Sequence, residues 1–200
     1  MCAKPNLKIF DFGCGTGGEI IGFLTALNEQ TDLSVQEVDI VALDGNCNAL
    51  RFYENVLTEL QPKLQFDVSN KISPIRIDDL YDLSIIDDIY AYTTFDIIFL
   101  SFKTVCEFVT KQQFEQNNAY AVVLNTFLPK LTNDGIALLV DVTSYNSVAE
   151  EWLPKMLDTG IKAANGQTII QNEGYNQVFK ISHSSRQNDM SKVAYRIIKK

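Results

Sequence analysis

The sequence predicts an α/β protein with a doubly wound, mostly parallel sheet, helices on both faces and an antiparallel strand at the C-terminal end. Three observations support this prediction. Short apolar runs alternate with longer segments of helical spacing along most of the 200-residue chain. A glycine-rich turn, residues 13–18, follows the first apolar run. Near the C-terminus, two strand-like runs are joined by a polar loop with no helix between them.

The first half of the chain predicts two strand–helix units and a short third strand. Lys8–Phe12 is an apolar run that the glycines end, and Glu19–Asn28 then places apolar residues at helical intervals. Val38–Leu43 is the second expected strand, and Cys47–Leu60 carries the next helical stripe. Pro74–Ile77 is expected to be the third strand, closed by two aspartates.

The second half continues the alternation before the antiparallel end. Phe95–Phe102 is apolar at its centre, as in a strand covered on both sides. Helical spacing follows over Thr104–Leu131, with a break near Asn117 and Asn118, and returns over Val148–Leu157. Between these two segments, a turn at Asn133-Asp134-Gly135 leads into a fifth expected strand. The remaining strands are Ile136–Val142 and the C-terminal pair Gln177–Ser182 and Val193–Lys199.

Length and composition indicate one globular domain over residues 1–200. The chain is 46% apolar and contains no run near the roughly 20 residues that span a bilayer. Met1–Leu7 lacks the apolar stretch of a secretory signal, so we expect a cytoplasmic protein without a membrane partner. One histidine and four dispersed cysteines predict neither a metal site nor a disulfide framework. The four cysteines are Cys2, Cys14, Cys47 and Cys106.

The net charge of −8 limits the choice of partner. Duplex DNA binding draws its affinity from neutralised phosphates, and an acidic chain disfavours it, while RNA or protein partners stay open. Acidic residues between Asp78 and Asp88 are expected to form a solvated helix face, or to attract a cationic acceptor. Basic residues that gather near the C-terminus are expected to form a solvated tail. These are Lys180, Arg186, Lys192, Arg196, Lys199 and Lys200.

The glycine loop predicts a site for a nucleoside-containing ligand. Gly13, Gly15 and Gly18 also satisfy the dinucleotide pattern G-x-G-x-x-G, so a nicotinamide cofactor is an alternative. Asp11 precedes the loop, where a carboxylate could face a cationic amino group, and Glu19 at the next helix start would oppose a pyrophosphate. Both features favour S-adenosylmethionine, which carries positive charge and no phosphate. Asp44, after the second strand, could accept the ribose hydroxyls of either cofactor.

These residues resemble the class I S-adenosylmethionine-dependent methyltransferases. Ile9–Gly17 matches the family's first motif, and Asp44-Gly45-Asn46 matches its acidic turn after the second strand. Leu131–Asp141 matches the lead into its fifth strand, with Asp134-Gly135 in place of a double glycine. The resemblance implies a seven-stranded Rossmann-like fold and S-adenosylmethionine as cofactor. The implied cofactor-binding residues are Asp11, Gly13, Cys14, Gly15, Gly17, Asp44, Gly45, Asn46, Asp78, Asp79, Leu80, Ser101 and Phe102.

The implied activity is methyl transfer by in-line displacement to an acceptor that the sequence does not identify: a small molecule, a protein or RNA. The acceptor is expected near Ser101 and Phe102, where this chain lacks the proline pair typical of enzymes that methylate base amino groups. Neither Cys106 nor Glu107, just beyond, is assigned a catalytic role. A non-catalytic relative that binds the cofactor is the main alternative, and an oxidoreductase the weaker one. Because the first strand begins within ten residues, the chain is expected to be a minimal core or a fragment lacking an N-terminal lid.

Overall fold

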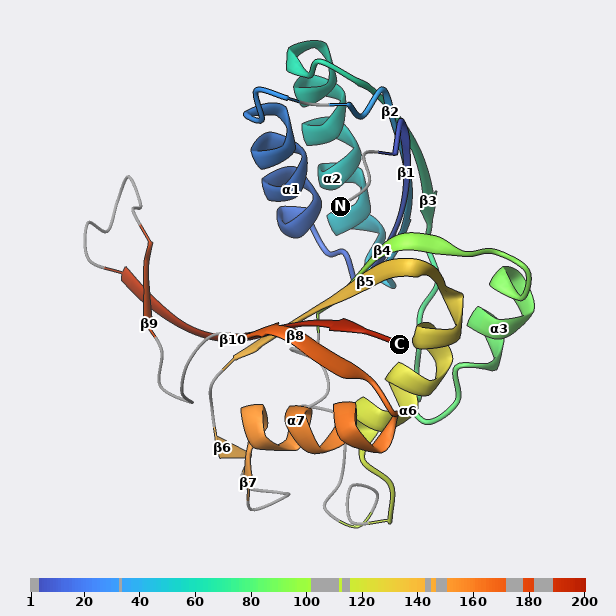
Figure 1. Cartoon of the computed structure of the whole chain (residues 1–200). Coiled ribbons are helices and arrows are strands. Elements are labelled where there is room, and N and C mark those ends of the chain that lie inside the picture. Colours follow the sequence, from blue (N-terminus) through green and yellow to red (C-terminus); the bar gives the residue numbers. More distant parts are fainter. Residues whose placement is uncertain are drawn as a thin grey trace.

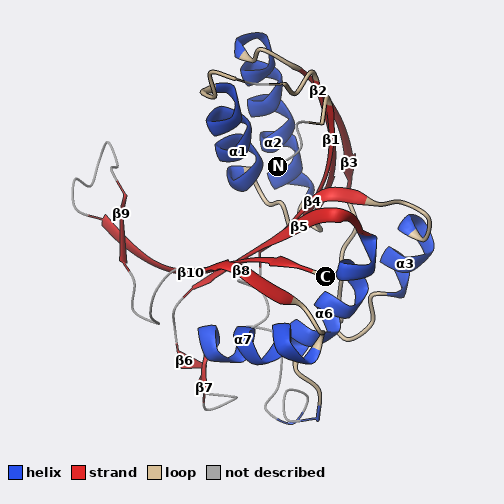
Figure 2. Ribbon diagram, in the orientation of Figure 1, coloured by secondary structure: helices blue, strands red, loops and turns tan. Residues whose placement is uncertain are grey.

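The computed structural model describes residues 4–32, 34–101, 112, 116–142, 145–146, 151–171, 178–181 and 189–200. Its main sheet has the strand order β3-β2-β1-β4-β5-β10-β8, with β9 paired to β10 outside this path. The chain enters the sheet near its middle, at β1 (Asn6–Phe12), and builds outward first to one side and then to the other (Figures 1 and 2). A small separate pair joins β6 (Tyr145–Asn146) to β7 (Glu151–Trp152).

Strand directions confirm the predicted mixed sheet. β1, β2 (Glu37–Leu43), β3 (Asp67–Ser73), β4 (Phe95–Ser101) and β5 (Leu131–Val142) pair in parallel. β10 (Asp189–Lys199) runs antiparallel to β5 and to β8 (Gln167–Gln171), so β10 alone is reversed among the seven strands of the main path. β9 (Val178–Ile181) and β10 form the predicted C-terminal antiparallel pair.

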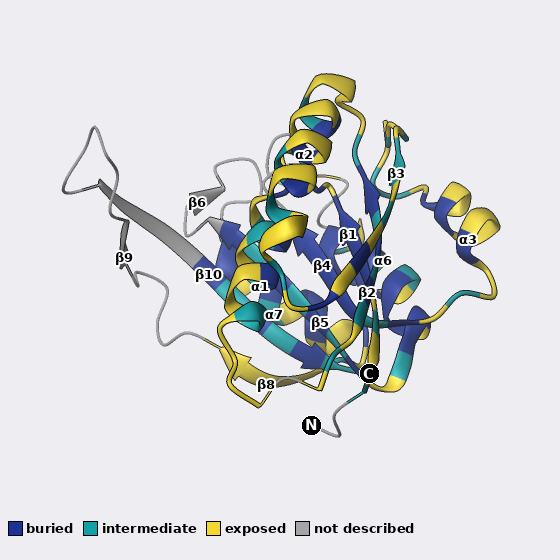
Figure 3. Ribbon diagram, turned by 90° about the horizontal axis from the view of Figure 1, so that it is seen from above, coloured by how far each residue is buried: buried dark blue, intermediate teal, exposed yellow. Residues whose placement is uncertain are grey.

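Helices cover both faces of the sheet, as predicted. α1 (Gly18–Asn28) and α2 (Cys47–Leu60) lie together on one face (Figure 1). α3 (Ser84–Tyr90), α6 (Ala119–Phe127) and α7 (Leu153–Ala163) lie on the other. Two separate clusters of buried side chains, one on each face, match this division. Figure 3 shows the result: the central strands are buried, and the outer sides of α1, α2 and α3 are exposed.

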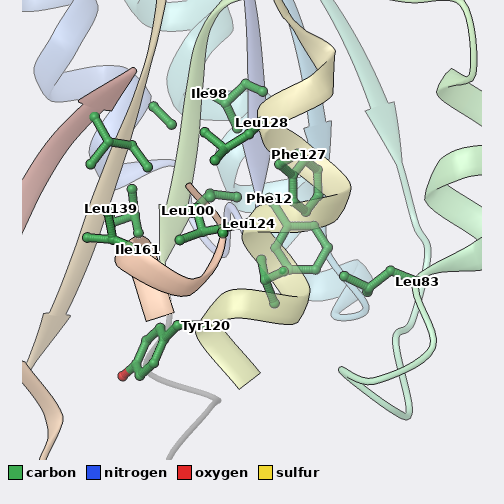
Figure 4. Close-up of a cluster of buried hydrophobic side chains, with 14 of the residues drawn as sticks. Phe12, Leu83, Ile98, Leu100, Tyr120, Leu124, Phe127, Leu128, Leu139 and Ile161 are labelled. Atoms are coloured by element: carbon green, nitrogen blue, oxygen red, sulfur yellow. The ribbon is translucent and has the colours of Figure 1, made fainter. Parts of the chain in front are cut away.

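Alternation along the central strands supplies both cores. On β1, Ile9 joins the cluster beneath α1 and α2, and its neighbour Phe10 joins the cluster on the opposite face. Figure 4 shows the second cluster, in which α6 presents Leu124 and Phe127 to side chains of the sheet, including Leu100. Because both faces of β1 and β4 are covered, apolar residues fill these strands almost continuously.

The third strand was predicted in the wrong place. Pro74–Ile77 is not a strand; β3 lies just before it, at Asp67–Ser73. β3 is the edge strand of the sheet, and only Val68 is fully buried along it. Because β3 is mostly polar, apolar spacing does not identify it as a strand. Ile75 and Ile77, which do form an apolar pattern, line a cavity.

After β4, the starts of β5 and α7 differ from the predictions, and one strand was not predicted. β5 begins at Leu131, and the expected turn at Asn133-Asp134-Gly135 is an irregularity within it, between the pairs Phe95–Leu131 and Ile97–Ile136. α7 begins at Leu153 and not at Val148, since residues 151–152 are in β7. The sequence missed β8, an exposed edge strand, entirely. The predicted helix over Thr104–Leu131 is seen as α6; residues 102–111 lie outside the described residues.

The predicted surface segments also need correction. Of the acidic run, only Asp87 and Asp88 lie in α3, and Asp87 pairs with the buried Lys130 at 2.9 Å. At the C-terminus, Arg196 is not part of a solvated tail: it is 4% exposed and binds Asp158 through Nε at 2.6 Å. Among the described residues, no helix combines the length and apolar character needed to cross a membrane.

α6 and α7 cross so closely that Gly160→Ala is expected to destabilise the protein. A Cβ at Gly160 would lie 2.5 Å from Cβ of Tyr120 and 3.0 Å from the backbone nitrogen of Ala121. The overlap should outweigh the gain in helix propensity and lower the free energy of unfolding by about 2 kcal/mol in urea titration. The matched control is Gly22→Ala in α1, where a Cβ meets nothing within 4 Å. This control should stabilise by about 0.5 kcal/mol or more, and equal effects at the two positions would contradict the expectation.

Candidate active site

A cavity of about 670 Å³ lies at the carboxyl ends of β1 and β2. This is the edge of a doubly wound sheet at which ligands bind, next to the point where the strand order reverses around β1 and β4. Three segments form its walls: the end of β1, the turn after β2, and the chain that follows β3. The lining residues are Phe12, Gly13, Leu43, Asp44, Gly45, Asn46, Ile75, Arg76, Ile77, Asp78, Asp79, Leu80 and Tyr81.

The loop after β1 has a backbone that only glycine adopts readily. Gly13, Gly15 and Gly17 all have positive φ, at 71°, 51° and 81°. The amide groups of Gly13 and Cys14 both donate to the carbonyl of Leu43, at 2.8 and 3.1 Å, and so fasten the loop to the end of β2. Gly17 then caps α1 and rests against the ring of Tyr53 from α2.

Asp44 joins the loop to the second turn. One carboxylate oxygen accepts a hydrogen bond from the backbone amide of Gly15 at 2.9 Å, and the other accepts from that of Asn46 at 2.7 Å. Asn46 in turn caps α2, because its side-chain oxygen accepts from the amides of Asn48 and Ala49. The carboxylate is therefore held in place at the cavity wall by two segments of backbone.

Asp11 is the most unusual residue of the site. It is 0% exposed, and neither of its carboxylate oxygens has a hydrogen-bond partner within the described part of the chain. Burial, and then the negative charges of Glu19 and Asp44, raise the pKa of Asp11 well above its ordinary value. Burial also raises the pKa of the neighbouring Cys14 thiol and Tyr53 phenol, so both of these are neutral.

The opposite wall comes from the chain after β3. Asp78 pairs with Arg76 at 2.6 Å, and both side chains are largely exposed. Asp79 accepts from the backbone amide of Tyr81 at 2.8 Å, which fixes the turn that brings Leu80 to the cavity. The Tyr81 hydroxyl donates to the carbonyl of Asn117 at 2.9 Å and ties this wall to the segment before α6.

Most of the residues predicted for the site come together at this edge. Those that line the cavity are Gly13, Asp44, Gly45, Asn46, Asp78, Asp79 and Leu80. Asp11, Cys14, Gly15 and Gly17 belong to the strand end and loop beside it. Ser101 ends β4 next to the loop, its carbonyl 3.6 Å from where a Cβ on Gly13 would lie. Phe102, Cys106 and Glu107 lie outside the described residues.

Ile75, Arg76 and Ile77 line the cavity, although their spacing predicts a strand. Tyr53, expected only as part of the helical stripe of Cys47–Leu60, supports the glycine loop. Of the other tyrosines, Tyr81 lines the cavity, Tyr90 and Tyr120 are buried in the core, and Tyr92 is fully exposed. The position of Ile75 and Ile77 just before Asp78 and Asp79, which are predicted site residues, is the sequence feature that could have assigned them to the site.

The described residues contain no group of three or more histidine, cysteine or acidic side chains placed to hold a metal ion. Of the cysteines within them, Cys14 is buried and Cys47 is exposed, and both are free thiols.

No protein-family model matches this sequence, and no curated protein matches it. Solved structures do match. A SAM-dependent methyltransferase from Methanosarcina mazei superposes with a TM-score of 0.57 at 12% identity, over 98% of this chain and 92% of that one. Precorrin-6y C5,15-methyltransferase from Geobacter metallireducens superposes with a TM-score of 0.52 at 12% identity, over 98% of this chain and 80% of that one. The glycopeptide N-methyltransferase MtfA superposes with a TM-score of 0.55 at 10% identity, over 96% of this chain and 82% of that one. Over nearly its whole length, the chain therefore has the fold of the S-adenosylmethionine-dependent methyltransferases.

Proposed function

We propose that the chain is an S-adenosylmethionine-dependent methyltransferase. The observation that carries the proposal is the cluster of acidic residues at the glycine loop: Glu19 and Asp44 both act electrostatically on the buried Asp11. S-adenosylmethionine has a sulfonium, an ammonium and a carboxylate, and therefore a net positive charge. Three acidic groups at one loop suit such a ligand, and the fold is the one that its transferases share.

The same charges argue against a dinucleotide. A pyrophosphate at the start of α1 would meet Glu19 in the first helical turn, and the charge of Asp44 acts on the same loop. Helix-start sites for phosphate depend on positive potential, which these carboxylates cancel. The nicotinamide alternative is therefore disfavoured by charge, although the glycine spacing alone permits it.

The residues present fit the parts of the cofactor. Asp44 uses one acceptor position on each oxygen, and because a carboxylate has about four, it can still accept two ribose hydroxyls. Ile75, Ile77 and Leu80 offer an apolar wall for the adenine, with Asp78 and Asp79 beside it as acceptors for its amino group. The methionine part would lie at the glycine loop, where three residues with positive φ leave the backbone open to close approach.

The bound cofactor would supply an electrophilic methyl group whose transfer removes charge from sulfur. The contribution of this chain is then mainly alignment, since well-placed reactants gain large effective molarities without a general base. We place the acceptor at the carboxyl end of β4, beside Ser101. Its chemistry is left open, because the structural neighbours include enzymes named for both a precorrin and a glycopeptide substrate. A cofactor-binding relative without turnover is the second candidate.

Calorimetry with S-adenosylhomocysteine, S-adenosylmethionine and NAD tests this proposal. Micromolar binding of the first two, and none of NAD, is the expected result. Asp44→Ala should weaken binding on the order of 100-fold, because two charged hydrogen bonds to the ribose are lost at about 1.5 kcal/mol each. The control is Asp39→Ala, in β2 just before Asp44, where the carboxylate accepts from the Ser69 hydroxyl and does not line the cavity; this variant should bind as the unmodified chain does.

Binding of NAD alone would overturn the proposal in favour of an oxidoreductase. Turnover distinguishes the two remaining candidates: release of S-adenosylhomocysteine in an acceptor screen identifies an enzyme. Tight binding with the cofactor never consumed by any acceptor would identify the inert relative.

A further inference from the structure

Asp11 is buried, and no described residue of the site donates a hydrogen bond to its side chain. A carboxylate sealed from water, without a hydrogen-bond donor, is far too costly to keep ionised unless a positive charge lies near it. The residues beside Asp11 on the adjacent strands supply no positive charge and no side-chain hydrogen bond. Asp11 lies opposite Ala42 on β2 and Phe99 on β4, which are both apolar.

Every titratable group of the described residues that acts on Asp11 makes ionisation harder. From α1 comes Glu19, and from the end of β2 comes Asp44, both of them carboxylates. The loop contributes the Cys14 thiol and α2 contributes the Tyr53 phenol, both uncharged. Burial raises the pKa of Asp11 for the same reason. Burial and these charges all favour the protonated form of Asp11 in the free protein.

A bound cofactor changes this balance at one point only. Its ammonium group brings a positive charge to the loop beside Asp11, where Gly13, Gly15, Gly17 and Gly18 have no side chains to keep the ligand away from the backbone. An opposite charge within a few ångströms favours the ionised acid, and it does so more strongly where water is excluded. The adenosine part has no such charge.

We propose that Asp11 is uncharged in the free protein and ionises when the ammonium group of the cofactor binds at the glycine loop, so that each binding event releases a proton to solvent. The proton leaves the Asp11 carboxyl group for the buffer, and the resulting carboxylate pairs electrostatically with the ligand's ammonium. The affinity for the cofactor then depends on pH through Asp11, which is buried in the free protein. This inference rests on the proposed function, because it needs a ligand with an amino-acid group.

The experiment counts protons and needs no turnover. Binding of S-adenosylhomocysteine is measured by calorimetry at pH 7 in buffers of different ionisation enthalpy, and the slope against that enthalpy gives the protons released. We expect a release approaching one proton, with affinity rising up to about tenfold per pH unit between pH 6 and 8. The matched ligand is 5′-methylthioadenosine, which keeps the nucleoside and lacks the amino-acid group. It should release none and bind with constant affinity.

Asp11→Asn identifies the source of the proton. The variant should bind S-adenosylhomocysteine more weakly, without proton release and with affinity independent of pH. Release that persists in the variant would assign the proton to another group and overturn the inference. Tight binding to the unmodified protein without release would overturn it too, while leaving the proposed function intact. Failure of both ligands to bind would overturn the proposed function and the inference together.

Discussion

Replacing Gly17 with alanine is expected to cost about 3 kcal/mol of folding free energy, or roughly 10 °C in Tm. Two effects combine at this position. The φ of 81° costs an L-residue about 1 kcal/mol, and a Cβ there would lie 1.8 Å from Cδ2 of Tyr53. Tyr53 is 0% exposed, so its ring has no free space into which it could move. Urea and thermal unfolding followed by circular dichroism measure the change.

Two neighbouring glycines separate the causes. Gly15→Ala has the φ penalty without the overlap, since nothing lies within 4 Å of its Cβ, and should cost about 1 kcal/mol. Gly18→Ala has neither, and at the first position of α1 it should be neutral or slightly stabilising. Equal effects at the three positions would show that the contact with Tyr53 does not hold the loop.

The second large effect concerns Asp11 and the stability of the free protein. Because the folded protein holds a proton on Asp11 that the unfolded chain loses at about pH 4, the native state binds more protons over the range above that pH. The free energy of unfolding therefore falls as pH rises, by up to about 1.4 kcal/mol per pH unit from this group, until the folded pKa is passed. Asp11→Asn removes this dependence, so the stability of the variant relative to the parent should rise with pH from about pH 4 until the folded pKa of Asp11 is passed.

The slope of the difference is the informative quantity. A difference in free energy of unfolding that is the same at every pH reflects only how well the amide fits the buried position. A difference that changes with pH shows that the folded parent binds a proton at Asp11. Asp88→Asn, on the exposed side of α3, is the control for the same substitution at an aspartate that faces solvent. Parallel pH profiles for Asp11→Asn and its parent would mean that Asp11 is ionised in the folded protein, contrary to its surroundings.

The sequence predicted the buried parts of the fold well, because buried strands and amphipathic helices leave periodic apolar patterns. β1, β2 and β4 with α1 and α2 were found nearly to their ends. β3 was misplaced and β8 was missed for a common reason: both are edge strands with largely exposed side chains, so neither shows the alternation of apolar and polar residues that marks a half-buried strand. The start of α7 was placed too early because Trp152 continues its apolar pattern while pairing in β7.

For the site, the residues that backbone conformation demands were the easiest to predict. The glycines and Asp44 are fixed by turns at strand ends, and such turns restrict residue type strongly. The wall formed by Ile75, Arg76 and Ile77 has no such restriction, since any apolar or flexible side chain could serve. The lack of a hydrogen-bond partner for Asp11 among the described residues could not be predicted either, because it depends on three-dimensional packing and not on the spacing of residues in the sequence.

The double attachment of Asp44 bears on how quickly a ligand can bind. Its two hydrogen bonds, to Gly15 and Asn46, hold both turns of the site in shape before any ligand arrives. The entropy of ordering those turns is thus lost during folding and does not fall on the binding step. Association should therefore proceed at the speed of encounter and dehydration, with a rate constant that rises linearly with ligand concentration and shows no plateau from a slow loop closure.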